Sequence, residues 1–129
     1  MMRESQIWRL INTIQKPYRD WHLIRIESST INGIPDVNAC IEGNEFWFEL
    51  KSNDDKNYGI SKYQINWIIK RQRAGGKAFI LHNSPLKREF KILEIRDSGL
   101  PVPVSRFPYT KPATILPVVL QELALRAAA

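Results

Sequence analysis

The spacing of hydrophobic positions predicts two helices in the first three quarters of the chain. Residues 4–16 carry apolar side chains at helical intervals, and Pro17 follows as a stop. Residues 61–74 show a second helical pattern, which ends at Gly75 and Gly76. Both segments have polar residues between the apolar ones, which is typical of helices that pack one face against a core.

Five further segments have the alternation or the apolar run of strands. The stretch "WHLIRIES" alternates from residue 21, and a hairpin is predicted from strands 34–42 and 45–51, with Gly43-Asn44 as a two-residue turn. Residues 77–82 read as a fully buried strand and residues 88–95 as an alternating one. The order of helix, three strands, helix and two strands predicts an α/β domain with a mixed sheet flanked by helices.

The composition changes near Gly99. Five of the eight prolines lie in "LPVPVSRFPYTKPATILP", and the chain continues into the apolar "VVLQELAL". Because proline removes a backbone donor and fixes φ, we expect an extended arm outside the core that finishes as a short helix. The predicted organisation is a core over residues 1–98 and a proline-rich C-terminal arm over residues 99–129.

Charge and cysteine content narrow the class of protein. Nineteen Lys and Arg against thirteen Asp and Glu give a net charge of +6. This surplus favours a polyanionic partner, with nucleic acid the first candidate, although a merely basic solvated surface is an equal alternative. A single cysteine excludes a disulfide framework and a zinc-ligand pair. With no signal-like or membrane-spanning run, we expect a soluble, cytoplasmic protein.

One face of the predicted hairpin carries the polar residues that are candidates for an active site. With Gly43-Asn44 as the turn, Asn38 faces Glu49 and Asp36 faces Lys51, so these four polar residues share a face. Asp36 and Glu49 are then diagonal neighbours, at roughly 7 Å. The opposite face is apolar and is predicted to be core: Val37, Ala39, Ile41, Phe46, Phe48 and Leu50.

Two converging carboxylates repel unless a cation or a proton intervenes. A divalent ion resolves the repulsion, and hard oxygen ligands select magnesium or manganese over zinc. Such an ion with Lys51 nearby suits phosphodiester cleavage, which needs charge stabilisation at phosphate. The alternative is a cross-strand salt bridge from Asp36 to Lys51, with Glu49 solvated.

The segments "GIPD…FELK" and "YQINWIIKRQRAGGKAFIL" together resemble the PD-(D/E)xK nuclease superfamily, and more closely the phage-type VRR-NUC nucleases related to Holliday-junction resolvases. The resemblance covers about residues 20–82 and says little about residues 97–129. It implies a restriction-endonuclease-like core with the element order α-β-β-β-α-β.

The resemblance also implies roles for individual residues. Asp36 and Glu49 would hold the metal, with the backbone carbonyl of Leu50 as a third ligand. Lys51 would position the attacking water or stabilise developing phosphate charge. Gln64 matches a catalytic glutamine of the family, although Ser61 to Gln64 is also a capping box that satisfies a helix N-terminus.

A further acidic ligand and the nucleic-acid contacts remain open at this stage. The superfamily often adds an acid from the first helix, for which Glu4 is the candidate, whereas Glu27 matches the R-x-E of phage relatives. The sequence does not decide between them. Candidate DNA-binding residues come from the first strand, a hydroxyl-bearing loop and the second helix: Arg25, Ser28, Ser29, Lys62 and Arg71.

The function expected from these residues is a Mg²⁺-dependent endodeoxyribonuclease, with Mn²⁺ as a possible substitute, that acts on branched DNA such as Holliday junctions. Two alternatives stay open: a non-catalytic DNA-binding or assembly module of the same fold, and a nicking or flap nuclease that acts with a partner. Because a junction presents two related cuts, we expect a homodimer in which residues 100–127 help form the contact; packing of this segment on its own subunit is an equal alternative. A phage origin would place the protein in the host cytoplasm.

Overall fold

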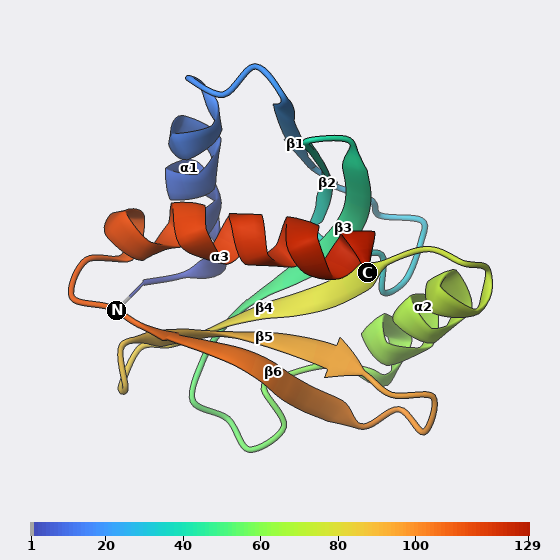
Figure 1. Cartoon of the computed structure of the whole chain (residues 1–129). Coiled ribbons are helices and arrows are strands. Elements are labelled where there is room, and N and C mark those ends of the chain that lie inside the picture. The colour runs from blue at the N-terminus through green and yellow to red at the C-terminus, as the bar shows by residue number, and fades with distance from the viewer. Residues whose placement is uncertain (1) are drawn as a thin grey trace.

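A computed structural model describes residues 2–129 and shows three helices and six strands in this part of the chain (Figure 1). The elements follow one another as α1 (Glu4–Gln15), β1 (Trp21–Arg25), β2 (Val37–Ile41), β3 (Asn44–Ser52), α2 (Lys62–Arg73), β4 (Ala78–Ser84), β5 (Glu89–Ile95), β6 (Pro101–Pro108) and α3 (Pro112–Ala128). The first six elements have the predicted order α-β-β-β-α-β, so the expected α/β architecture is confirmed.

The six strands form one sheet in sequence order, from β1 at one edge to β6 at the other. Only β3 and β4 pair in parallel, and α2 makes the crossover between them; the other neighbours are antiparallel. The sheet is therefore mixed, as predicted, and β3 and β4 lie at its centre. All seven residues of β4 are buried, in agreement with the predicted buried strand.

The helices cover the two faces of the sheet unequally. Helices α1 and α3 lie on one face, and α2 lies on the other (Figure 1). The α1/α3 side holds the larger core, which contains the whole predicted apolar face of the hairpin. The α2 side holds a smaller core around Ile68 and Ile80, with Trp47 and Trp67 packed against it. Side chains of β3 alternate between these faces, so Glu49 and Lys51 point to the α2 side.

The hairpin turn differs from the prediction by one residue. The turn residues are Glu42 and Gly43, and both have positive φ, 52° and 84°, as a type I′ turn requires. Asn44 is instead the first residue of β3 and pairs with Ile41. The register shifts by two residues, so Asn38 pairs with Trp47 rather than Glu49. A shift of two residues leaves every side chain on its predicted face.

The C-terminal segment is part of the core, which corrects the expectation of an arm outside it. Residues 101–108 form β6, which pairs with β5 along its length, and α3 runs for 17 residues across the sheet. Five residues of α3 are buried in the larger core: Leu116, Val119, Leu120, Leu123 and Ala124. Across residues 2–129, none of the helices combines the length and apolarity of a membrane span.

Candidate active site

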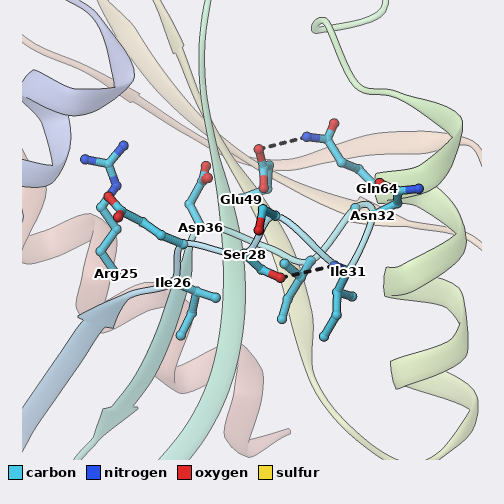
Figure 2. Close-up of a pocket in the computed structure, with 12 residues that line it drawn as sticks. Arg25, Ile26, Ser28, Ile31, Asn32, Asp36, Glu49 and Gln64 are labelled. Atoms are coloured by element: carbon cyan, nitrogen blue, oxygen red, sulfur yellow. Dashed lines mark hydrogen bonds between the residues drawn. The ribbon is translucent and has the colours of Figure 1, made fainter.

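Asp36 and Glu49 line one cavity of about 640 Å³, at the edge of the α2 face of the sheet (Figure 2). Asp36 immediately precedes β2, and the observed register, extended by one residue, places it directly opposite Glu49. The two carboxylates are thus closer than the diagonal pair that the sequence predicted. Asp36 does not face Lys51, and no Asp36–Lys51 salt bridge forms among the described residues.

A loop before β2 forms the outer wall of the cavity. Its Gly33 has a φ of 80°, and a Cβ atom there would lie 2.2 Å from the backbone oxygen of Tyr63. Only glycine fits, because the loop backbone lies directly against the first turn of α2. This contact brings the loop, the hairpin and the start of α2 together around the two carboxylates.

Glu49 is a buried carboxyl group whose pKa is strongly raised. Its residue is 5% exposed, and burial together with the neighbouring Asp36 carboxylate raises its pKa from 4.5 to about 9. Lys51 acts in the opposite direction but does not offset these effects. Two carboxylates in one cavity with so little cationic compensation from the protein form a site that favours a cation.

Gln64 connects the start of α2 to Glu49. Its side-chain Nε2 donates a hydrogen bond to Glu49 Oε2 over 2.9 Å, drawn as a dashed line in Figure 2. Its Oε1 accepts a bond from the backbone N–H of Ser61, and its own N–H donates to Ser61 Oγ. The predicted capping box is present, and the bond to Glu49 is an additional contact that the sequence did not predict.

Lys51 reaches the site through Glu49 rather than through the cavity. Its Nζ lies 3.9 Å from Glu49 Oε2, and the lysine is not among the residues that line the cavity. On β4 its parallel partner is His82, which is 3% exposed. Burial lowers the pKa of His82, so this imidazole is neutral and adds no second cation beside Lys51.

The structure separates the two candidates for a further acidic ligand. Glu27 lines the same cavity as Asp36 and Glu49, whereas Glu4, in the first turn of α1, does not. Throughout residues 2–129, however, no three side chains of His, Cys, Asp or Glu gather closely enough to hold a metal by themselves. Of the two candidates, only Glu27 therefore shares the cavity with Asp36 and Glu49.

The backbone of Leu50 also belongs to the site. Its N–H donates a hydrogen bond to Asp36 Oδ2 over 3.0 Å, which fixes the carboxylate against β3. The family resemblance implied the Leu50 carbonyl as a third metal ligand; the structure places the Leu50 peptide beside Asp36, and the role of the carbonyl stays a prediction.

The candidate DNA-binding residues fall into two groups. Arg25, Ser28 and Ser29 line the cavity, together with Ile31 and Asn32, which the sequence did not single out. Lys62 and Arg71 lie on α2 and outside the cavity lining. The polar loop gave no signal that Ile31 and Asn32 would join the site, since loops of this composition are usually solvated.

No family model matches the sequence, and no curated protein matches it. Among solved structures, the chain is similar to Hjc from Archaeoglobus fulgidus, a Holliday junction resolvase from an archaeal hyperthermophile. The similarity has a TM-score of 0.48 and 16% sequence identity, and it covers 85% of this chain and 91% of the other. At this TM-score and identity, the chemistry of the chain has to be inferred from its own residues.

Proposed function

We propose that this chain is a metal-dependent endodeoxyribonuclease of the PD-(D/E)xK type. The observation that carries the proposal is the meeting of Asp36 and Glu49 in one cavity, with Glu49 buried and Lys51 beside it. A purely structural role does not account for a buried carboxylate placed next to a second one, because the pair costs free energy in the absence of a cation.

The donor atoms of the site suit magnesium or manganese. The side chains that converge on the cavity with free oxygen atoms are the carboxylates of Asp36 and Glu49, and neither histidine nor cysteine lines the cavity. Asp36 and Glu49 would hold the ion, with the Leu50 carbonyl as a proposed third ligand and Glu27 within the same cavity. When bound, such an ion polarises a phosphate and lowers the pKa of a water.

The residues around the ion would orient its ligands, stabilise charge and contact the DNA. Gln64 holds the Glu49 carboxylate in one orientation from the α2 side, and the Leu50 N–H holds Asp36 from the β3 side. Lys51 supplies positive charge next to Glu49, where negative charge would develop on the phosphate. Arg25 and the Ser28-Ser29 loop, at the cavity wall, would contact the sugar-phosphate backbone.

Branched DNA is the proposed substrate, and a homodimer the proposed assembly. In this chain the buried face of α3 packs on its own sheet, while Val118 and Leu125 of the same helix stay exposed and could contribute to a subunit contact. Light scattering would report the assembly. Cleavage of four-way junction, flap, duplex and single-stranded DNA in Mg²⁺ tests the substrate, since faster junction cleavage supports the proposal and faster flap cleavage favours a flap nuclease.

A further inference from the structure

Arg71 is held in a fixed position on the flank of α2 by two tryptophans. Its guanidinium carbon lies 4.6 Å from the ring centre of Trp67 and 5.3 Å from that of Trp47. The ring centres of the two indoles are 5.2 Å apart, so the two side chains form one continuous aromatic surface. A guanidinium over an indole face is stabilised by the ring quadrupole and keeps its charge.

The surrounding backbone leaves room for this arrangement. Gly76 has no positive φ, so its backbone conformation does not explain the glycine. A Cβ atom at Gly76 would lie 2.5 Å from Cδ and 2.7 Å from Cγ of Arg71. The glycine is therefore needed for the path of the arginine side chain between the end of α2 and the tryptophans.

The Arg71 guanidinium has no acidic partner among the described residues. Arg71 is exposed, and within residues 2–129 it takes part in none of the ion pairs. By contrast, Arg106 and Arg126 each pair with a glutamate. The five guanidinium donors of Arg71 are thus preorganised on an aromatic surface and remain available to an anion from outside.

The position of Arg71 relative to the carboxylates indicates how far from the cavity an anion bound by Arg71 would lie. Gln64, Trp67 and Arg71 are spaced i, i+3 and i+7, so they form one stripe along α2 that begins at Glu49. On β3, Trp47 is two residues before Glu49 and points to the same face. Seven helical residues span about 10 Å, which is about three nucleotides of rise along a DNA strand.

We propose that Arg71, stacked on Trp47 and Trp67, binds a backbone phosphate of the DNA strand about three nucleotides from the one that is cut. This inference rests on the proposed function and adds a positioning residue to it. Arg71 would orient the strand along α2 so that the scissile phosphate enters the cavity of Asp36 and Glu49. It would bind substrate without contacting the reacting atoms.

The test compares Arg71→Met, which keeps the side-chain stem, with Arg73→Met on the same helix as a matched control. DNA binding is measured by fluorescence anisotropy in Ca²⁺ over a range of salt concentrations. Loss of one duplex phosphate contact lowers the slope of log K against log salt by about 0.9. We expect this loss for Arg71→Met and a smaller change for Arg73→Met, with KM raised and kcat retained in cleavage assays.

A second variant and a modified substrate complete the test. Gly76→Ala leaves every charge in place but displaces Arg71, so it should weaken binding like Arg71→Met. A neutral methylphosphonate about three nucleotides from the cut should weaken the wild type and leave Arg71→Met unaffected. An unchanged salt slope in a folded Arg71→Met protein, or equal effects of the two arginines, would overturn the inference. Wild-type protein that neither binds nor cuts DNA would instead remove the proposed function.

Discussion

Gln64 and Glu49 are joined by a hydrogen bond of 2.9 Å that links the N-terminus of α2 to the candidate metal site. The same glutamine side chain completes the capping box with Ser61. A helix cap and the orientation of a buried carboxylate therefore depend on one residue, and the two roles can be separated experimentally.

Replacing Gln64 and Ser61 by alanine should separate them. Ser61→Ala removes the cap acceptor but keeps the Gln64 amide at Glu49, so we expect a stability loss of about 1 kcal/mol and nearly full cleavage. Gln64→Ala should lose similar stability and most of the cleavage rate. Chemical denaturation and initial rates measure the two effects. If Ser61→Ala loses as much activity as Gln64→Ala, the amide acts only as a cap.

The Glu49 carboxyl should make the metal-free protein less stable as pH rises. Its pKa in the folded state is about 9, above the ordinary 4.5, so the folded state holds a proton that the unfolded state releases between these values. The contribution of Glu49 to the free energy of unfolding therefore falls as pH rises through that window. In EDTA, Glu49→Gln should melt several degrees above wild type at pH 9 and show no gain near pH 4.5.

Addition of Mg²⁺ provides the control for this prediction. Added Mg²⁺ should stabilise the wild type at pH 8 and have little effect on Glu49→Gln, because a ligand that binds only the folded state raises its stability. Parallel thermal melts with and without EDTA give the comparison. A variant that is less stable than the wild type at every pH would mean that the Glu49 charge is compensated within the protein.

Lys51 should affect turnover more than binding. Its ammonium lies 3.9 Å from Glu49 and outside the cavity lining, so it acts on charge in the site rather than as a primary anchor for DNA. We expect Lys51→Ala to lower kcat by about 10²–10³-fold, with Kd for DNA changed little. Single-turnover cleavage and anisotropy measure the two quantities. An equal fall in affinity would identify Lys51 as a phosphate anchor.

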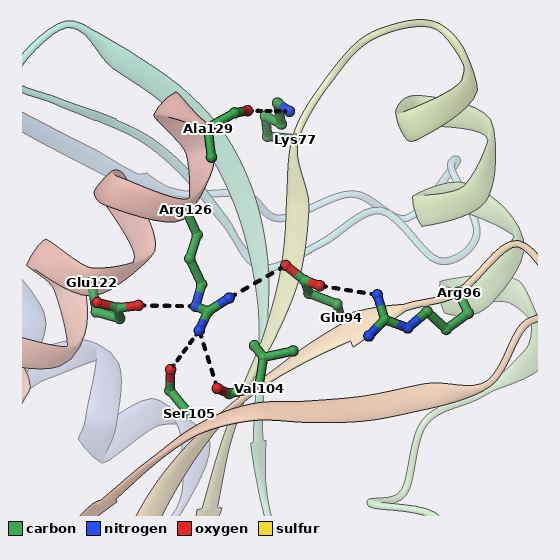
Figure 3. Close-up of polar contacts among 8 residues, drawn as sticks. All are labelled: Lys77, Glu94, Arg96, Val104, Ser105, Glu122, Arg126 and Ala129. Carbon is green, nitrogen blue, oxygen red and sulfur yellow. Dashed lines mark hydrogen bonds and ion pairs between the residues drawn. The ribbon is translucent and has the colours of Figure 1, made fainter.

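Helix α3 should be essential for folding. Leu120 is fully buried on the sheet, so Leu120→Ala should lower the free energy of unfolding by about 2–5 kcal/mol, whereas Leu125→Ser, at a position 67% exposed, should lower it little. Arg126 fastens the same helix to β5 and β6 through Glu94, the Val104 carbonyl and Ser105 (Figure 3). Urea unfolding of the two variants tests this, and equal stabilities would mean that α3 is peripheral.

The polar and apolar faces of the hairpin were predicted correctly, even though the turn was misplaced by one residue. Sequence patterns report which side of a strand a residue occupies, and a register shift of two residues preserves that side. They did not reveal that Glu42, a residue seldom found at positive φ, would occupy a turn position. The placement of Asp36 opposite Glu49 follows from that turn, so the register became clear only from the structure.

The C-terminal segment was mispredicted because its prolines were taken as a sign of irregular chain. Pro101, Pro103 and Pro108 lie on β6, an edge strand, where a missing N–H donor can be tolerated. Pro112 begins α3, where the N–H has no helical partner anyway. Similarly, the helical pattern of 61–74 predicted α2 but not the stacking of Arg71 on Trp47, which depends on the pairing of distant segments.

The central claim is that Asp36 and Glu49 together hold a divalent ion for phosphodiester hydrolysis. The most direct measurement is the cleavage rate of wild-type protein, Asp36→Asn and Glu49→Gln, purified in parallel, across a Mg²⁺ titration with an EDTA control. We predict cleavage by the wild type that rises with Mg²⁺ and stops in EDTA, and loss of cleavage in both folded variants. Wild-type rates in both variants, or cleavage that persists in EDTA, would contradict the assignment.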